Sequence, residues 1–330
     1  MNLKWHPMSF SLRADKSPLT LVSNHTQAGP RIAVLIPCYN EAAAIGRVVM
    51  DFRAALPAAE IFVYDNNSRD DTVGAARAAG AVVRSEARQG KGNVVRRMFG
   101  DIDADYYVLV DGDATYDAAS APAMVAKACA EQLDMVVGCR ESTEQSAYRR
   151  GHRFGNSLLT GVVTTLFGRH FTDILSGYRV FSRRFVKSFP ALANGFETET
   201  ELTVHALELR MPVGEVLTPY NSRPEGSSSK LRTYRDGWRI LQTILQLYRL
   251  ERPLAFFSVI AGIAAAVALV IALPLGITYL ESGLVPRFPT AILATGMGIL
   301  AALSLACGLI LDTVTRGRQE MRRLIYLTAE

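Results

Sequence analysis

The sequence has few cysteines and little imbalance of charge. Its 4 cysteines include no Cys-x-x-Cys pair and no metal-ligand spacing, which excludes a zinc module and a disulfide framework and indicates a reducing compartment. The 36 Lys and Arg residues outnumber the 31 Asp and Glu residues by only five, giving a net charge of +5. This excess is too small for a typical nucleic-acid-binding protein, so we expect no nucleic-acid partner.

Two common nucleotide-binding fingerprints are also missing. No Gly-x-Gly-x-x-Gly follows the first predicted strand, and no Gly-x-x-x-x-Gly-Lys-Ser/Thr occurs anywhere. These absences disfavour a dinucleotide-dependent oxidoreductase and a P-loop nucleotidase. Residues 1–30 contain no apolar run resembling a signal peptide, and we expect them to form a flexible leader. A hydrophobic content of 49% excludes wholesale disorder.

Two long apolar runs lie near the end of the chain. Neither 254–280 nor 288–311 contains a charged residue, and each exceeds the roughly 20 residues that a membrane-spanning helix needs. A buried core helix is the alternative, which two such lengths in succession disfavour. The connector 281–287 is short, so we predict a transmembrane hairpin over 253–312, followed by a cytoplasmic tail over 313–330.

The charges beside these runs predict their orientation. Five arginines lie between 232 and 252 and four between 316 and 323, whereas the connector holds only Arg287. Basic flanks face the cytoplasm, so we expect a multi-pass plasma (inner) membrane protein whose two termini and large N-terminal part lie on that side. Residues 233–252 alternate apolar residues and arginines near helical spacing, which predicts an interfacial amphipathic helix; a core helix of the soluble domain is the alternative. Small residues in both apolar runs favour a homo-oligomer.

The soluble part, 31–232, alternates strand and helix signals. This alternation predicts an α/β domain with a mostly parallel, Rossmann-like sheet, whose ligand lies at the carboxyl ends of the strands. The predicted strands are 32–36, 60–64, 81–84, 106–110 and 135–138, and the predicted helices are 41–56, 71–79 and 91–99.

Polar segments follow four of the predicted strands. They are Pro-Cys-Tyr-Asn-Glu at 37–41, Asp-Asn-Asn-Ser-Arg-Asp-Asp-Thr at 65–72, Gln-Gly-Lys-Gly at 89–92 and Asp-Gly-Asp at 111–113. Each alone is typical of turns and helix caps. Together they should meet at one sheet edge, which capping alone does not explain.

The residue types in these segments suit a nucleoside diphosphate. Asp111 and Asp113 offer hard oxygen ligands to Mg²⁺ or Mn²⁺, which would neutralise charge on a leaving diphosphate. Gly112 would let the backbone approach the ligand closely. Asp65 is placed to accept hydrogen bonds from a base or ribose, and Lys91 to reach a sugar ring or a phosphate.

These segments resemble the nucleotide-sugar half of a family 2 glycosyltransferase with the GT-A fold. Residues 138–140, 172–179 and 195–202 and the basic loop 220–230 are similar to the polyprenyl-phosphate glycosyltransferases. That group contains the dolichyl-phosphate mannose synthases and the bacterial undecaprenyl-phosphate glucosyltransferases. The two C-terminal apolar runs resemble the bacterial glucosyltransferases more closely.

The resemblance implies a role for individual residues. The residues that would hold the nucleoside are Pro37, Tyr39, Glu41, Asp65 and Asn66, and those also at the nucleotide sugar are Lys91 and Gly112. The residues that would hold the metal and the diphosphate are Asp111, Asp113 and Thr115. The residues that would bind the acceptor phosphate are Arg140, Arg179, Arg223, Ser229 and Lys230. Asp173 would orient the acceptor's ligands or act as a base. For each arginine the alternative is a surface salt bridge, and a solvated helix face would explain part of the run Glu197, Glu199 and Glu201.

The implied reaction is transfer of a hexose from a nucleotide diphosphate sugar to undecaprenyl phosphate, with inversion. Gly112 and one extra residue in the basic loop depart from the mannose synthases and favour the glucosyltransferase branch, with UDP-glucose as the leading donor. Other UDP-hexoses and GDP-mannose remain open. Asn66 stands where many relatives have the second aspartate of an Asp-Asp pair. A processive family 2 polysaccharide synthase is one alternative, although 246–250 lacks the tryptophan of the Gln-x-x-Arg-Trp motif. A non-catalytic membrane adaptor is another, disfavoured by the intact acidic and basic residues.

Overall fold

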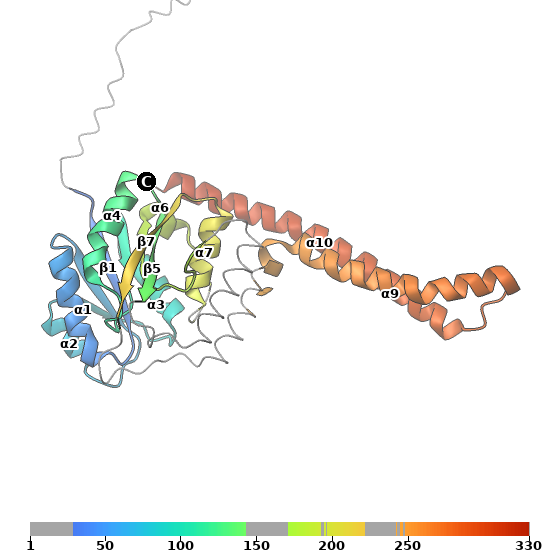
Figure 1. Ribbon diagram of the computed structural model, residues 1–330, viewed down its shortest axis with the longest axis horizontal. Coiled ribbons are helices and arrows are strands. Elements are labelled where there is room, and N and C mark those ends of the chain that lie inside the picture. The colour runs from blue at the N-terminus through green and yellow to red at the C-terminus, as the bar shows by residue number, and fades with distance from the viewer. Residues whose placement is uncertain are drawn as a thin grey trace, which may run out of the picture. The chain divides into compact units, whose positions relative to one another are not determined.

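A seven-stranded sheet organises the first part of the chain (Figure 1). The computed structural model describes residues 29–142, 171–192, 195, 197–221, 242, 245–246 and 248–329. The chain divides into two compact units, Met1–Pro30 and Arg31–Glu330, and the second holds all the described helices and strands. The strands are β1 (Ile32–Cys38), β2 (Glu60–Asp65), β3 (Val82–Ser85), β4 (Tyr106–Leu109), β5 (Met135–Ser142), β6 (Arg179–Ser182) and β7 (Val213–Tyr220). The helices are α1 (Ala42–Ala55), α2 (Thr72–Ala78), α3 (Lys91–Asp101), η1 (Ala118–Ser120), α4 (Ala121–Ala130), α6 (Arg183–Ser188), α7 (Thr198–Glu208), α9 (Pro253–Ser282) and α10 (Phe288–Thr328).

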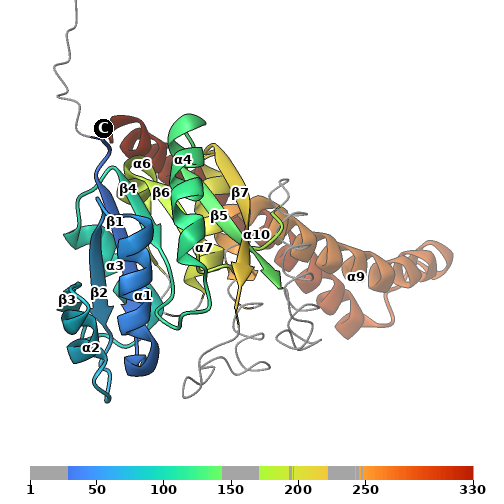
Figure 2. The same ribbon diagram turned by 60° about the vertical axis from the view of Figure 1, so that its left-hand side comes forward.

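The strand order is β3-β2-β1-β4-β6-β5-β7, and the strands are mostly parallel (Figure 2). β1 pairs in parallel with β2 and β4, β2 with β3, and β5 with β7, whereas β6 runs antiparallel to β4 and β5. The prediction of an α/β, mostly parallel sheet is therefore confirmed, and the five predicted strands appear as β1 to β5. β6 and β7, which the sequence reading did not include, complete the sheet.

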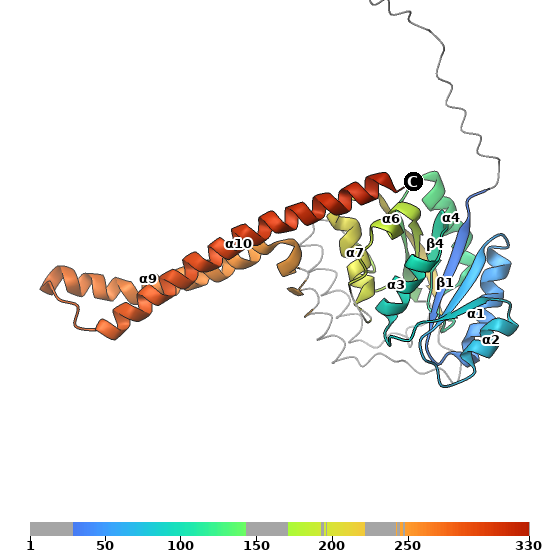
Figure 3. The ribbon, with the colours of Figure 1, turned by 180° about the vertical axis from the view of Figure 1, so that it is seen from behind.

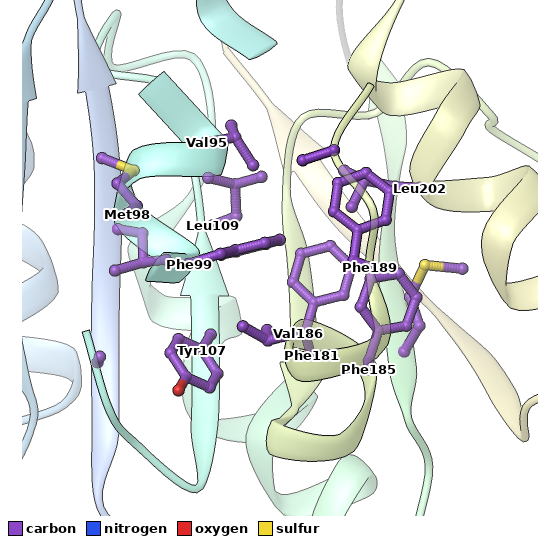
Figure 4. Close-up of a cluster of buried hydrophobic side chains, with 14 of the residues drawn as sticks. Val95, Met98, Phe99, Tyr107, Leu109, Phe181, Phe185, Val186, Phe189 and Leu202 are labelled. Carbon is purple, nitrogen blue, oxygen red and sulfur yellow. The ribbon is translucent and has the colours of Figure 1, made fainter. Parts of the chain in front are cut away.

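Helices cover both faces of the sheet (Figures 1 and 3). Side chains of β1 alternate between these faces, as a buried strand requires. Val34 and Ile36 join the hydrophobic cluster that includes α1, α2 and α4, whereas Ala33 and Leu35 join the cluster that includes α3, α6 and α7. Aromatic rings fill the second cluster, in which the Phe99 ring lies 5.8 Å from that of Phe181 (Figure 4).

Two apolar helices follow the sheet domain. α9 and α10 are long and apolar enough to cross a membrane, with mean hydropathy of 2.7 and 2.0 in their most apolar segments. Only 11% and 17% of those segments is buried, so neither resembles the core helix of a soluble protein. α10 continues as one helix to Thr328, well past the predicted end of the hairpin at 312. Most of the predicted interfacial helix, 233–252, lies outside the described residues.

The last turns of α10 are bonded to the sheet domain. The Tyr326 hydroxyl donates to Asp134, which directly precedes β5, at 2.6 Å. Arg322 donates to Glu208, the last residue of α7, at 2.6 Å, and Arg318 donates to Glu251 at 3.1 Å. Both glutamates are buried, with side chains 3% and 5% exposed. The C-terminal part of α10 is therefore fixed to the sheet domain by polar and charged groups as well as by the intervening chain.

We predict that Glu208 makes this junction sensitive to pH. Burial, and then the neighbouring Glu251 carboxylate, raise the pKa of Glu208 to about 7 from 4.5, although Arg322 opposes the shift. A carboxyl whose folded-state pKa is raised contributes stability below about pH 4.5 and loses it as the pH rises through about 7. Between pH 5 and 8 the free energy of unfolding of Glu208→Gln should therefore rise relative to that of wild type, by on the order of 1–2 kcal/mol.

Thermal unfolding in mild detergent across that pH range measures the difference. Glu131→Gln, at an exposed position after α4, is the matched control. The difference in its unfolding midpoint from wild type should be the same at every pH. A constant offset for Glu208→Gln as well would contradict the assignment of the raised pKa to this carboxyl.

Candidate functional site

The carboxyl ends of the parallel strands bring the predicted polar segments together. Cys38 is in register with Asp65 on the neighbouring strand, and the Asn66 amide donates to the Cys38 carbonyl at 2.9 Å. The Asp65 carboxylate accepts from the Ser68 amide, and the Glu41 amide donates to the Thr72 hydroxyl at 2.9 Å. Pro37 and Tyr39 flank this register at the end of β1. The candidate nucleoside residues therefore lie on two adjacent strand ends.

Asn66 performs a different task from the one predicted for it. The nitrogen of its side-chain amide donates to the carbonyls of Glu86 and Arg88, both at 2.8 Å. The oxygen of the same side-chain amide accepts from the backbone amide of Gly90 at 2.7 Å. The residue is 3% exposed. Only a side-chain amide both donates and accepts in this way, so Asn66 secures the loop that leads into α3. An ionised aspartate could not donate to the two carbonyls.

A buried lysine lies between two carboxylates at the centre of the site. The Lys91 ammonium, on the first turn of α3, is 2.5 Å from Asp111 Oδ1 and 2.5 Å from Glu199 Oε1. Burial opposes its charge, but the two ion pairs prevail and raise the pKa of Lys91 above its ordinary value. Glu199 is 5% exposed. A solvated helix face therefore does not explain Glu199 or Glu201, which are both buried, whereas Glu197 is partly exposed.

The second aspartate of the Asp-Gly-Asp segment is held by its own turn. Asp113 Oδ1 accepts from the Thr115 amide at 3.2 Å and from the Thr115 hydroxyl at 2.6 Å. Ala114 between them has a left-handed backbone, with φ of 57°. In this arrangement Thr115 orients the carboxylate, whereas the sequence predicted it as a direct metal ligand.

The donor set fits a divalent cation that binds together with a diphosphate. No group of three His, Cys, Asp or Glu side chains in the described part of the chain could enclose a metal ion by itself. Mg²⁺ and similar ions are often held by one or two carboxylates, with substrate phosphates and water supplying the remaining oxygens. Asp111 and Asp113, one residue apart at the end of β4, provide that minimal set.

Arg140 and Asp173 form a two-bonded ion pair beside this site. Arg140 Nε donates to Asp173 Oδ2 at 2.6 Å, and its Nη2 donates to Oδ1 at 2.8 Å. The guanidinium also lies over the Tyr220 ring, 5.5 Å from its centroid. Because both oxygens of Asp173 accept from one guanidinium, this geometry suits orientation of Arg140 better than removal of a proton.

Arg179 is placed away from any ligand. Its side chain is fully buried, and it donates to the carbonyls of Ile174 and Ser176 and to the Thr203 hydroxyl. Burial lowers the pKa of Arg179, an effect that the nearby Glu199 carboxylate opposes. The predicted role in binding the acceptor phosphate is therefore wrong in this geometry, since no donor of the guanidinium faces open space. The remaining predicted acceptor residues, Arg223, Ser229 and Lys230, lie outside the described residues.

Two further residues belong to the site and were not predicted. A Cβ atom at Gly177 would lie 2.5 Å from Asp111 Oδ2 and 3.2 Å from Lys91 Nζ, so only glycine fits against this pair. The Gly177 amide donates to the Tyr116 hydroxyl at 2.9 Å. Burial raises the pKa of Tyr116 well above its ordinary value, which keeps the hydroxyl protonated. Gly177 lies inside the 172–179 motif, but nothing in its type alone indicated which side chains it contacts.

With this geometry established, the similarity to known proteins can be stated. A sequence profile described as Glycosyl transferase family 2 matches residues 33–189. Glycosyltransferase AglJ of Haloferax volcanii is 34% identical over 244 residues, which cover 73% of this chain and 80% of that protein. The chain therefore belongs to glycosyltransferase family 2.

Individual relatives extend the comparison. Protein RfbJ of Shigella flexneri is 59% identical over 123 residues, which cover 37% of this chain and 95% of that protein. Glucosyl-3-phosphoglycerate synthase from Mycobacterium tuberculosis, solved with Mn²⁺, uridine diphosphate and glucosyl-3-phosphoglycerate, superposes with a TM-score of 0.56 at 24% identity. That similarity covers 66% of this chain and 80% of the synthase, and it shows a shared fold.

Gly112 packs closely against the end of β1. A Cβ atom there would lie 2.6 Å from Cys38 Sγ. We predict that Gly112→Ala displaces the Asp111–Asp113 segment and destabilises the fold by about 1–3 kcal/mol. Adding Cys38→Ala removes the clashing sulfur and should restore most of the loss.

Thermal unfolding of the single and double variants measures this coupling, which should exceed about 0.5 kcal/mol. Gly100→Ala is the control, because a Cβ atom there meets nothing within 4 Å. Additive effects of Gly112→Ala and Cys38→Ala would refute the packing explanation.

Proposed function

We propose that this glycosyltransferase moves a hexose from a nucleotide diphosphate sugar to a polyprenyl phosphate, with UDP-glucose and undecaprenyl phosphate as the leading pair. The observation that carries the proposal is the ionic cluster of Lys91, Asp111 and Glu199 beside Asp113, on a chain that continues into two apolar helices. Such a cluster suits a diphosphate and its cation, and the apolar helices suit an acceptor that resides in a membrane.

The donor half of the proposal is supported by the fold neighbour. The solved synthase holds Mn²⁺ and uridine diphosphate, and Mg²⁺ or Mn²⁺ is the cation that we assign to Asp111 and Asp113. When bound, the cation neutralises negative charge on the leaving nucleoside diphosphate. Asp65, Glu41, Tyr39 and Pro37 surround the nucleoside in this proposal, since they lie at the adjoining strand ends.

The acceptor needs positioning more than activation. An oxygen of the lipid phosphate attacks C1 of the hexose, and the bond from C1 to the diphosphate oxygen breaks, its electron pair leaving with the nucleoside diphosphate. The phosphate is already ionised, so no base has to remove a proton from it. Arg140, held by Asp173, supplies a guanidinium that binds phosphate through two bonds. One in-line displacement inverts C1 and yields a β-linked lipid from an α-linked donor.

We assign Arg223, Ser229 and Lys230 to the same acceptor phosphate. The arginines that flank α9 and α10 support a cytoplasmic position for the sheet domain, which is part of this proposal. Small residues along both helices favour contacts between copies, and we propose a homotetramer assembled through them.

Incubation of the purified full chain with undecaprenyl phosphate and a panel of nucleotide sugars tests the proposal. We expect one lipid-linked monosaccharide, with UDP-glucose the preferred donor, detected by mass spectrometry of the extracted lipid. A polymer of increasing length would indicate a processive synthase instead. Absence of product with every donor and both cations would overturn the proposal.

We predict that transfer depends on Asp113. Asp113→Asn keeps an acceptor for Thr115 but weakens cation binding, so turnover should fall by about 10²-fold or more. Asp51→Asn removes an exposed carboxylate of α1 and should leave turnover unchanged. The midpoints of thermal unfolding should differ little among the three proteins. Full turnover in Asp113→Asn, or in wild type treated with EDTA, is the result that this assignment cannot accommodate.

A further inference from the structure

We propose that Glu199 is a sugar-binding residue, whose second carboxylate oxygen accepts a hydrogen bond from a hydroxyl of the transferred hexose. The inference deepens the proposed function and rests on its donor half. It goes beyond the Asp-Gly-Asp segment and the basic residues, because it assigns the sugar itself to the first turn of α7.

The two oxygens of Glu199 are in unequal surroundings. Oε1 accepts from the Lys91 ammonium at 2.5 Å. Oε2 is buried and has no hydrogen-bond partner among the described residues. An ionised carboxylate accepts about four hydrogen bonds, and a buried acceptor left unsatisfied costs about 1–3 kcal/mol. Oε2 is therefore an acceptor that a bound ligand would satisfy.

The charges around Oε2 select a neutral donor. A phosphate oxygen placed against Oε2 would be repelled by the Glu199 carboxylate, because the Lys91 ammonium lies on the other oxygen. A second cation is disfavoured because the Lys91 ammonium already bridges these carboxylates and the buried Arg179 guanidinium adds positive charge nearby. A hydroxyl can donate to Oε2 without changing this balance, and a hexose presents several hydroxyls.

The position of Oε2 suits the sugar rather than the nucleoside. Lys91 connects Glu199 directly to Asp111, the first acid of the proposed diphosphate site. The hexose of a nucleotide sugar is attached to the outer phosphate of that diphosphate, so it lies next to the site that Asp111 and Asp113 define.

The helices that carry Lys91 and Glu199 are held in a fixed relation. Val95 and Phe99 of α3 and Leu202 of α7 belong to one buried cluster (Figure 4). Gly177 packs directly against Asp111 and Lys91, so these side chains cannot move toward Gly177. Oε2 is thus presented by a rigid framework, which favours selection of one hydroxyl geometry.

A comparison of Glu199→Gln with singly deoxygenated donors tests the inference. Wild type should lose about 10–100-fold in kcat/KM with the one deoxy-hexose nucleotide that lacks the recognised hydroxyl. With the intact donor, kcat/KM of Glu199→Gln should be lower than that of wild type by a similar factor. Replacing the intact donor by that deoxy donor should lower kcat/KM of the variant little further. The penalties of the other deoxy donors should remain unchanged in the variant.

Equal losses in Glu199→Gln with every donor would overturn the inference, because Glu199 would then act only through Lys91. Glu201→Gln is the matched control: Glu201 lies on the same helix, is equally buried and accepts from the Leu192 amide at 2.7 Å. Its effect, whatever its size, should be the same for all donors.

Binding measured by calorimetry, with Mn²⁺ and no acceptor, separates this inference from the proposed acceptor. Glu199→Gln should bind uridine diphosphate as wild type does, yet lose about tenfold or more in affinity for the intact nucleotide sugar. Equal weakening of both ligands would contradict the assignment. If wild type binds the nucleotide sugar but transfers nothing to polyprenyl phosphate, the acceptor proposal fails while the binding comparison still decides the role of Glu199.

Discussion

The buried ion pairs of Lys91 are the interaction on which the site depends. An ammonium removed from water is stable only when carboxylates compensate it, and Asp111 and Glu199 do so from the loop after β4 and from α7. Three elements far apart in the sequence are thereby joined at one point. Loss of the Lys91 charge would leave two carboxylates without a partner, whereas loss of one carboxylate would leave a single ion pair, so Lys91 links the Asp-Gly-Asp segment to α3 and α7.

The same helix, α7, connects the site to the apolar hairpin. Its first turn carries Glu199, and its last residue, Glu208, is paired with Arg322 of α10. The Tyr326–Asp134 hydrogen bond ties α10 to the start of β5, the strand that also carries Arg140. The acceptor that we propose is a lipid phosphate, which would require the site to be held at a fixed height above the membrane. These contacts are suited to that requirement.

The sequence predicted the fold well because the strands are continuous apolar runs that end in polar turns. The runs at 32–36 and 106–110 are indeed neighbouring parallel strands, and Asp111 follows the second of them. β6 was missed because its four residues give no periodic signal and because it inserts antiparallel between β4 and β5. Its place is set by tertiary pairing, which no local pattern reports.

Residue types predicted the site less completely than the fold. Asp111 and Lys91 were predicted, since polar segments after four successive strands are more than turns and helix caps explain. Glu199 was not singled out, because a Glu-Thr-Glu run is also typical of an exposed helix face, and only its burial against Lys91 distinguishes it. Arg179 was misassigned for the converse reason: it donates to backbone carbonyls inside the core, where sequence provides no sign of its environment.

A structure of the full chain in lipid nanodiscs with Mn²⁺ and a slowly transferred nucleotide sugar tests the account most directly. The account predicts the diphosphate and cation at Asp111 and Asp113, with one hexose hydroxyl within hydrogen-bonding distance of Glu199 Oε2. A nucleotide sugar bound elsewhere, or a hexose pointing away from α7 with Oε2 still unsatisfied, would contradict it.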